Sequence, residues 1–120
     1  MATISKVKLS GSTDGRGVAV AANSSEGTVI HTGSGTATTY DEIWLWASNF
    51  NTSTETLVLQ WGGVTEAGDH FIATVNPNET VLIAPGWVLK GNASTALIVK
   101  AYSTTANKVN ITGFINQIVA

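Results

Sequence analysis

Cysteine is absent from the sequence, proline occurs twice, and only 14 of the 120 residues carry a charged side chain. Without cysteine the chain has no disulfide scaffold, no thiolate metal site and no cysteine nucleophile. A net charge of −2 is the opposite of what a nucleic-acid-binding surface requires, so we expect no nucleic-acid partner. No apolar run approaches the ~20 residues of a membrane span. The first ten residues contain no signal-peptide core, so we expect synthesis in the cytosol and no membrane association.

Short neutral side chains provide most of the polarity. The chain has 17 threonines, 10 serines and 9 asparagines, while 43% of its residues are hydrophobic. This composition is too apolar and too weakly charged for a disordered chain. For a mass of 12.5 kDa, the area scaling of folded monomers predicts an exposed surface of about 6,200 Å². The sequence is therefore long enough for one domain whose core needs no metal or disulfide.

Strand-forming residues recur along the chain at short intervals. Valine, isoleucine and threonine together number 38, and β-branched side chains favour strands. Apolar–polar alternation between turn-forming residues predicts strands at 4–9, 27–33, 42–48, 55–61, 70–75, 80–84, 87–90, 95–102 and 108–118. Short strands at such regular spacing predict an all-β fold, a single antiparallel β-sandwich of jelly-roll-like type.

The predicted strand 42–48 is apolar on both of its faces. Ile43 and Leu45 point to one side, and Trp44 and Trp46 point to the other. Leaving two indole rings in water would forfeit roughly 1.5–3 kcal/mol for each ring. We therefore interpret this strand as central in the sandwich or as part of a subunit interface, with Trp44 and Trp46 as the candidate contact residues.

Residues 1–26 differ in composition from the rest of the chain. They contain Lys6, Lys8 and Arg16, which are half of all the basic residues, and a glycine-rich stretch with the composition of a linker. We expect a flexible N-terminal arm over residues 1–26 and a β-sandwich domain over residues 27–120.

Charge is divided unevenly along the chain. Residues 17–89 hold seven acidic residues and no basic one, whereas residues 90–120 hold three basic residues and no acidic one. Two interpretations stay open. Either interleaved strands mix the charges on one folded surface, or the basic arm docks onto an acidic patch of a neighbouring subunit.

Catalytic and metal-binding patterns are missing from the sequence. His31 and His70 are the only histidines, and neither forms the His-x-His spacing that would place two metal ligands on one face of a strand. The Gly-x-Ser-x-Gly turn of serine hydrolases does not occur, nor does a Walker loop or a dinucleotide-binding glycine pattern. We therefore expect a protein that is not an enzyme, with no catalytic residue, no cofactor and no metal.

One tryptophan offers an alternative function. Trp87 follows the turn formers Pro85 and Gly86, where an indole ring can stay partly exposed. Exposed aromatic rings on a β-sandwich can serve as platforms for sugar rings, so a glycan-binding module that uses Trp87 is an alternative. A position in the core or at a subunit interface is the competing interpretation, since tryptophan is enriched in both.

Six runs of the sequence resemble small virion proteins of tailed bacteriophages. These runs are GRGVAVAA (15–22), GTVIHT (27–32), DEIWLWA (41–47), LVLQWGG (57–63), IAPG (83–86) and ANKVNITGFIN (106–116). They cover most of the chain from Leu9 onward and consist of turn glycines and apolar strand positions. The resemblance implies a structural protein of the virion, made in the cytoplasm of the bacterial host.

Small β-sandwich proteins of such virions often serve as capsid decoration or cement proteins, and these are commonly trimeric. The resemblance therefore implies a homotrimer on the capsid surface that binds the major capsid protein and stabilises the head. Trp44 and Trp46 would then lie between subunits, while Lys6, Lys8 and Arg16 would contact the capsid. A tail or head-fibre component is the alternative within the virion, and a glycan-binding module is the alternative from another class.

Overall fold

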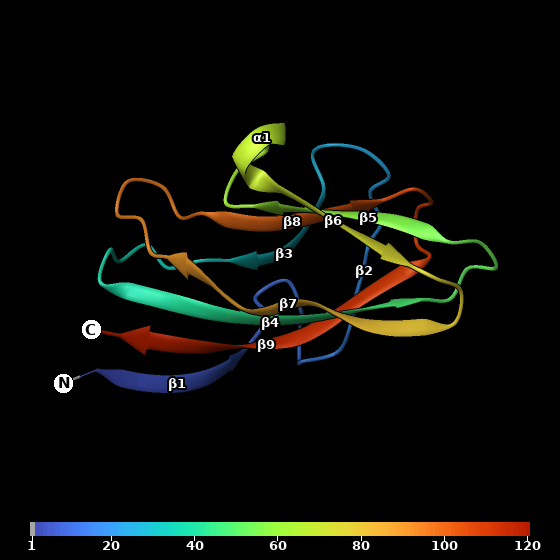
Figure 1. Ribbon diagram of the computed structural model, residues 1–120. Coiled ribbons are helices and arrows are strands. Elements are labelled where there is room, and N and C mark those ends of the chain that lie inside the picture. The colour runs from blue at the N-terminus through green and yellow to red at the C-terminus, as the bar shows by residue number, and fades with distance from the viewer. Residues whose placement is uncertain (1) are drawn as a thin grey trace.

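Nine strands and one short helix are found in residues 2–120, the part of the chain that the computed structural model describes (Figure 1). In chain order they are β1 (Thr3–Lys8), β2 (Val18–Ala19), β3 (Thr28–Thr32), β4 (Thr39–Asn49), β5 (Glu55–Trp61), α1 (Glu66–Asp69), β6 (His70–Val75), β7 (Glu79–Lys90), β8 (Ile98–Ser103) and β9 (Val109–Val119). The helix α1 is a single turn with non-helical backbone angles at Ala67 and Gly68. The all-β fold class expected from the sequence is confirmed.

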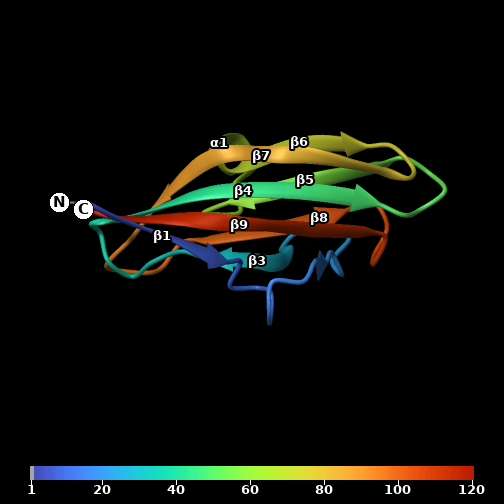
Figure 2. The ribbon, with the colours of Figure 1, turned by 90° about the horizontal axis from the view of Figure 1, so that it is seen from below.

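Two antiparallel sheets pack face to face. The first sheet has the strand order β1-β9-β4-β7, with β2 also beside β9, and the second sheet has the order β3-β8-β5-β6. The pairs β1–β9, β3–β8, β4–β7 and β5–β6 are nested, as if one long hairpin were rolled into two sheets. This nesting is the jelly-roll arrangement. Figure 2 shows β7, β4, β9 and β1 side by side in the first sheet.

The core lies between the two sheets and follows a period-two alternation. In β4, the side chains of Ile43, Leu45 and Ala47 are fully buried, and the side chains between them are partly exposed. In β5, Leu57 and Leu59 face the core, and Val58 and Gln60 on the opposite face of the strand are buried as well. The folded chain exposes 6176 Å², which agrees with the area that scaling predicts for its mass.

The segment 1–26, expected as a flexible arm, is largely built into the sandwich. β1 pairs with β9 in unbroken register over all six of its residues, and β2 pairs with the same strand further along. Leu9 and Val20 are fully buried in the core. Gly11 approaches β3 so closely that a Cβ atom there would lie 2.5 Å from the carbonyl oxygen of Ile30. The expected boundary at residue 26 is therefore corrected, because the long strand β9 takes its partner strands from this segment.

β7 runs as one strand through the turn formers that predicted a break between 80–84 and 87–90. Pro85 is tolerated because β7 lies at the edge of its sheet, where a missing N–H donor leaves no partner unsatisfied. The register of β4 against β7 shifts on both sides of Trp44 and its partner Pro85. Gly86 adopts a left-handed φ of 76°, which is typical of a bulge. The turn formers thus bend one continuous edge strand.

Candidate interaction surface

The outer face of the first sheet carries the side chains that point away from the core. β4 directs Trp44 and Trp46 to this face, as the sequence alternation predicts. Phe114 of β9 joins them, since it pairs directly with Trp44. The second sheet covers only the inner face of β4, and no other described element lies over the outer face (Figure 1).

Trp44, Trp46 and Phe114 form an aromatic cluster at the centre of this face. The ring centroids of the two tryptophans are 6.4 Å apart, and their planes are inclined by 23°. The Phe114 ring lies 6.3 Å from Trp44 and 6.1 Å from Trp46. Each ring is largely buried by its neighbours on the sheet, although no other described element covers it. Aromatic pairs of this kind gain about 0.5–1.5 kcal/mol beyond their area burial, so the cluster is a rigid apolar surface.

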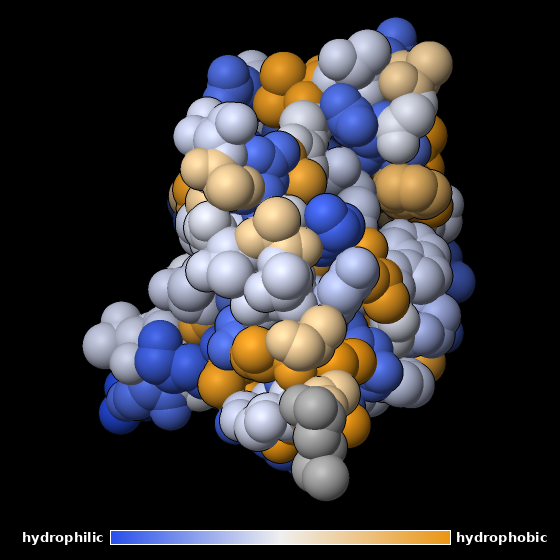
Figure 3. Space-filling view, turned by 90° about the vertical axis from the view of Figure 1, so that its left-hand side faces the viewer, coloured by the Kyte–Doolittle hydropathy of each residue, from blue (hydrophilic) through white to orange (hydrophobic). Residues whose placement is uncertain are grey.

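Exposed aliphatic side chains extend this surface toward both edges of the sheet. Ile4 of β1 is 67% exposed, and Leu82 and Val88 of β7 are 45% and 55% exposed. Their register partners place them on the same face as the aromatic cluster. Figure 3 looks at the end of the molecule that bears both termini and shows hydrophobic residues near its lower end, as well as at its top and right-hand side. We call the aromatic cluster together with Ile4, Leu82 and Val88 the aromatic face. Lys6 and Asn116 lie between Ile4 and the cluster, and exposed apolar patches rimmed by polar residues mark interaction sites.

A carboxylate lies beside the aromatic cluster. Trp44 donates a hydrogen bond of 2.7 Å from Nε1 to Oε1 of Glu42, and Asn116 donates one of 3.1 Å from Nδ2 to the same oxygen. The hydrogen bond from Trp44, followed by that from Asn116, holds the pKa of Glu42 below its ordinary value of 4.5. The Trp44 ring also packs on the bare backbone of Gly86, where a Cβ atom would lie 2.9 Å from Cζ2. These contacts fix the orientation of the Trp44 indole.

The three basic residues expected to contact a capsid are divided by the fold. Lys6 lies on β1, and its Nζ atom is 4.3 Å from the centroid of the Phe114 ring. Lys8 is two residues further along, and its Nζ atom donates a hydrogen bond of 2.6 Å to the carbonyl oxygen of Ser12. Arg16 lies in the loop after β1 and forms an exposed ion pair of 3.1 Å with Asp14. The structure therefore brings Lys6 and Lys8, but not Arg16, to the aromatic face.

The unevenly distributed charges are only partly mixed by the fold. Lys100 forms an ion pair with Glu26, which joins a C-terminal base to an acid from the middle of the chain. Lys6 and Lys8 form no ion pair with any carboxylate among residues 2–120.

Trp87 lies at the margin of the core and not on the aromatic face. Its ring packs edge-on against Trp61, with centroids 5.5 Å apart, and against Phe71 at 4.9 Å. Trp61 and Phe71 belong to the second sheet, so this group closes the gap between the edge strands β6 and β7. The Trp87 ring thus contacts two other aromatic rings.

A histidine and an aspartate form a buried pair between β3 and β4. His31 Nε2 lies 2.7 Å from Asp41 Oδ2, and the two side chains are 5% and 1% exposed. The backbone N–H of Ser10 donates to His31 Nδ1, so Nδ1 carries no proton and Nε2–H donates to Asp41. Gln117 donates to the other carboxylate oxygen. The pair has no solvent access and instead attaches the segment after β1 to the sandwich.

Glu55 is a second buried acid, at the opposite end of the sandwich. Burial alone would raise the pKa of Glu55, but hydrogen bonds from Ser103, Asn51 and Thr105 outweigh it and hold the pKa below its ordinary value of 4.5. The donor–acceptor distances are 2.7 Å, 3.0 Å and 2.8 Å in that order. The carboxylate therefore joins the loop after β4 to the loop after β8.

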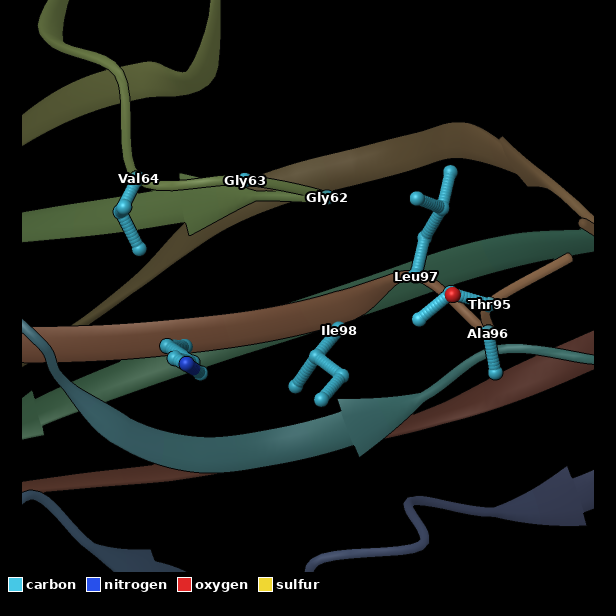
Figure 4. Close-up of a pocket in the computed structure, with 8 residues that line it drawn as sticks. Gly62, Gly63, Val64, Thr95, Ala96, Leu97 and Ile98 are labelled. Atoms are coloured by element: carbon cyan, nitrogen blue, oxygen red, sulfur yellow. The ribbon is translucent and has the colours of Figure 1, made fainter.

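A pocket of about 210 Å³ lies between the end of β5 and the start of β8 (Figure 4). Gly62, Gly63 and Val64 line one side, and residues 95–98 line the other. Lys100 is the only charged residue of the lining, and Glu26 already pairs with it. The pocket therefore lacks the convergent polar groups that ordinarily orient a small-molecule ligand.

No group of three or more metal-ligating side chains occurs among residues 2–120. Over the same residues, no helix is long and apolar enough to cross a membrane. No protein-family model and no curated protein matches the chain.

Three residues of this surface were not predicted from the sequence: Phe114, Glu42 and Asn116. The alternation in 108–118 separates Phe114 and Asn116 from the core-facing Ile115, and this signal was available. The alternation does not say which side chains of β4 they meet, because that depends on the register between two distant strands.

Proposed function

We propose that this protein is a non-enzymatic structural protein of a tailed-phage virion, a capsid decoration protein that forms a homotrimer on the major capsid protein. The aromatic face carries the proposal. It gathers three aromatic rings and three exposed aliphatic side chains on one sheet face that nothing described covers. A second copy packed on this face would remove these side chains from water.

Burying this face would contribute free energy to association. Fully burying a large apolar side chain contributes roughly 1.5–3 kcal/mol. The rings of Trp44, Trp46 and Phe114 are already largely buried, so each would contribute at most about a third of that on association. Homo-oligomeric interfaces are more apolar than the rest of a protein surface, which agrees with the composition of this face.

The neutral polar surface also favours assembly. Threonine, serine and asparagine number 36 in this chain, against 14 charged residues. A neutral hydroxyl or amide costs less to remove from water than an ionised group does. Subunit and capsid contacts therefore exclude water here at lower cost than on an ordinary charged surface.

The proposed function is tested on shells assembled from the major capsid protein of the same genome. The purified protein is mixed with the shells, sedimented with them and imaged by electron microscopy. We expect density for three copies around an axis where capsomers meet. The double variant Trp44→Ala/Trp46→Ala should lose both the trimer and the density. Ile72→Ala, which truncates a 72% exposed apolar residue on β6 of the second sheet, should retain both.

Two outcomes would contradict the decoration role. Absence of the wild-type protein from the shell contradicts it directly. Density confined to the tail or to a fibre of the complete virion contradicts it in favour of a tail or head-fibre component.

The glycan-binding alternative is tested separately at Trp87. Its ring packs against Trp61 and Phe71, which leaves less of its surface free for a sugar. We expect no saturable change of tryptophan fluorescence with any glycan that an array identifies. Saturable binding that Trp87→Ala abolishes in a folded protein would favour a glycan-binding module.

A further inference from the structure

The free edge of β1 is open along its whole length. One side of β1 pairs with β9, and no strand of residues 2–120 pairs with the other side. Five of its six residues are exposed, and the pairing with β9 has no bulge. β1 also contains no proline or glycine. Such an edge presents a row of unpaired N–H and C=O groups to an incoming strand.

The other three sheet edges are less suited to pairing. β7 contains Pro85 and two register shifts, and β3 contains a register shift after Val29. β6 lies beside β7 of the opposite sheet, where Phe71 packs on Trp87 at 4.9 Å. Bulges, prolines, covering elements and charged side chains, lysine above all, are means by which proteins protect sheet edges. β1 has no bulge, proline or covering strand among the described residues, and its protection consists of Lys6 and Lys8, which disfavour a basic partner strand.

The charge beside this edge selects the kind of strand that fits. Ile4, Lys6 and Lys8 alternate along β1 and point to the outer face of the sheet. Neither lysine pairs with a carboxylate among the described residues. A strand added to β1 would place every second side chain directly beside these three residues. Acidic side chains at those positions would gain cross-strand ion pairs.

A second copy of β1 is a poor partner for the same reason. In-register parallel pairing of two copies, or antiparallel pairing centred on Val7, would bring the lysines of one chain directly against those of the other. Like charges directly opposite each other destabilise a strand pair.

We propose that the β1 edge binds an extended segment of the major capsid protein that carries acidic side chains at alternate positions. The segment continues the first sheet beyond β1 through backbone hydrogen bonds, and Lys6 and Lys8 select it by charge. The identity of the strand donor rests on the proposed function, whereas the acidic-strand preference of the edge rests only on the geometry of β1.

The probe is an eight-residue peptide that alternates glutamate and valine, with acetylated and amidated ends. Two comparison peptides carry lysine in place of glutamate, or N-methyl groups on alternate backbone nitrogens. Amide resonances are followed by NMR during titration, together with amide hydrogen exchange. We expect the acidic peptide to shift the resonances of β1 and to slow exchange of its edge amides. The N-methylated and lysine peptides should not bind.

A charge-reversed variant tests the selection. The variant Lys6→Glu/Lys8→Glu should bind the acidic peptide about tenfold more weakly than the wild type does. It should bind the lysine peptide instead. Lys90→Glu is the matched control, because Lys90 lies on the same sheet face but on the opposite edge strand. It should leave acidic-peptide binding unchanged.

Three results would overturn the edge assignment. Equal binding of the N-methylated peptide would show charge attraction without strand addition. Exchange protection on β6 or β7 would place the strand elsewhere. Failure of the acidic peptide to bind at millimolar concentration would refute the acidic-strand preference.

The shells separate this inference from the proposed function. If the acidic peptide binds β1 but the protein does not bind shells, the decoration role fails and the edge preference stands. If shells bind wild type and Lys6→Glu/Lys8→Glu equally, the capsid-strand assignment fails and the decoration role stands.

Discussion

Replacing Leu9 by alanine tests whether the N-terminal segment is part of the folded sandwich. Leu9 follows β1 directly, is 1% exposed and belongs to the central cluster of buried side chains. Leucine-to-alanine changes at such sites cost about 2–5 kcal/mol, because they remove apolar burial and leave a cavity. We expect a loss of about 3 kcal/mol.

That loss converts into a large change of melting temperature. Unfolding entropy is about 2.1 cal/mol/K per residue near 60 °C. For a chain of 120 residues, a loss of about 3 kcal/mol lowers the melting temperature by about 12 °C. Thermal unfolding followed by circular dichroism measures the shift, at one protein concentration and with the oligomeric state verified for each variant.

Thr3→Ala is the matched control for this measurement. Thr3 lies on the same segment but is exposed and is not part of the aromatic face, so its truncation should change stability by less than about 0.5 kcal/mol. If Leu9→Ala melts at the wild-type temperature, the segment is a detached arm and the reasoning from burial fails.

Three further substitutions test the buried polar groups and the second aromatic group. Asp41→Ala removes the acceptor of the buried His31 N–H and should cost about 2–3 kcal/mol, measured by urea unfolding at neutral pH. Glu55 has a lowered pKa in the folded state, so its stabilisation is present above about pH 4.5 and is lost as the pH falls. In Glu55→Gln the urea midpoint should therefore fall less steeply below that pH than it does in the wild type. An equally steep fall would contradict the stabilising role of the Glu55 carboxylate. Trp87→Ala should lower the free energy of unfolding by about 2 kcal/mol, because Trp87 packs against Trp61 at the margin of the core. A variant as stable as the wild type would indicate that the Trp87 ring is exposed to solvent.

Period-two alternation was sufficient to predict the sandwich and the inward faces of its central strands. Ile43 and Leu45 in β4, like Leu57 and Leu59 in β5, are core residues because each strand buries one face against the opposite sheet. The same alternation identified Trp44 and Trp46 as side chains in need of cover.

The N-terminal segment was misread because its composition is that of a linker. β1 is mostly exposed and pairs with β9, which lies about a hundred residues further along the chain. Composition carries no information about such a long-range pairing. Leu9 is a single buried residue in polar surroundings, and Val20 lies in the short apolar run 18–22, which is too short for a clear periodic signal.

The predicted break in β7 does not occur, because β7 lies at the edge of its sheet. Pro85 and Gly86 ordinarily end a strand, but at an edge they produce a bulge that the neighbouring strand accommodates. Phe114 was missed as a neighbour of Trp44 for a related reason, since only the register of β4 against β9 brings the two rings together.

The mass of the protein in solution tests the role of the aromatic face most directly. Sedimentation equilibrium at tens of micromolar should give three times the 12.5 kDa chain mass for the wild type and for Ile72→Ala. Trp44→Ala/Trp46→Ala should give the mass of a single folded chain. A wild-type protein that remains a strict monomer at this concentration would contradict the aromatic face as a subunit interface.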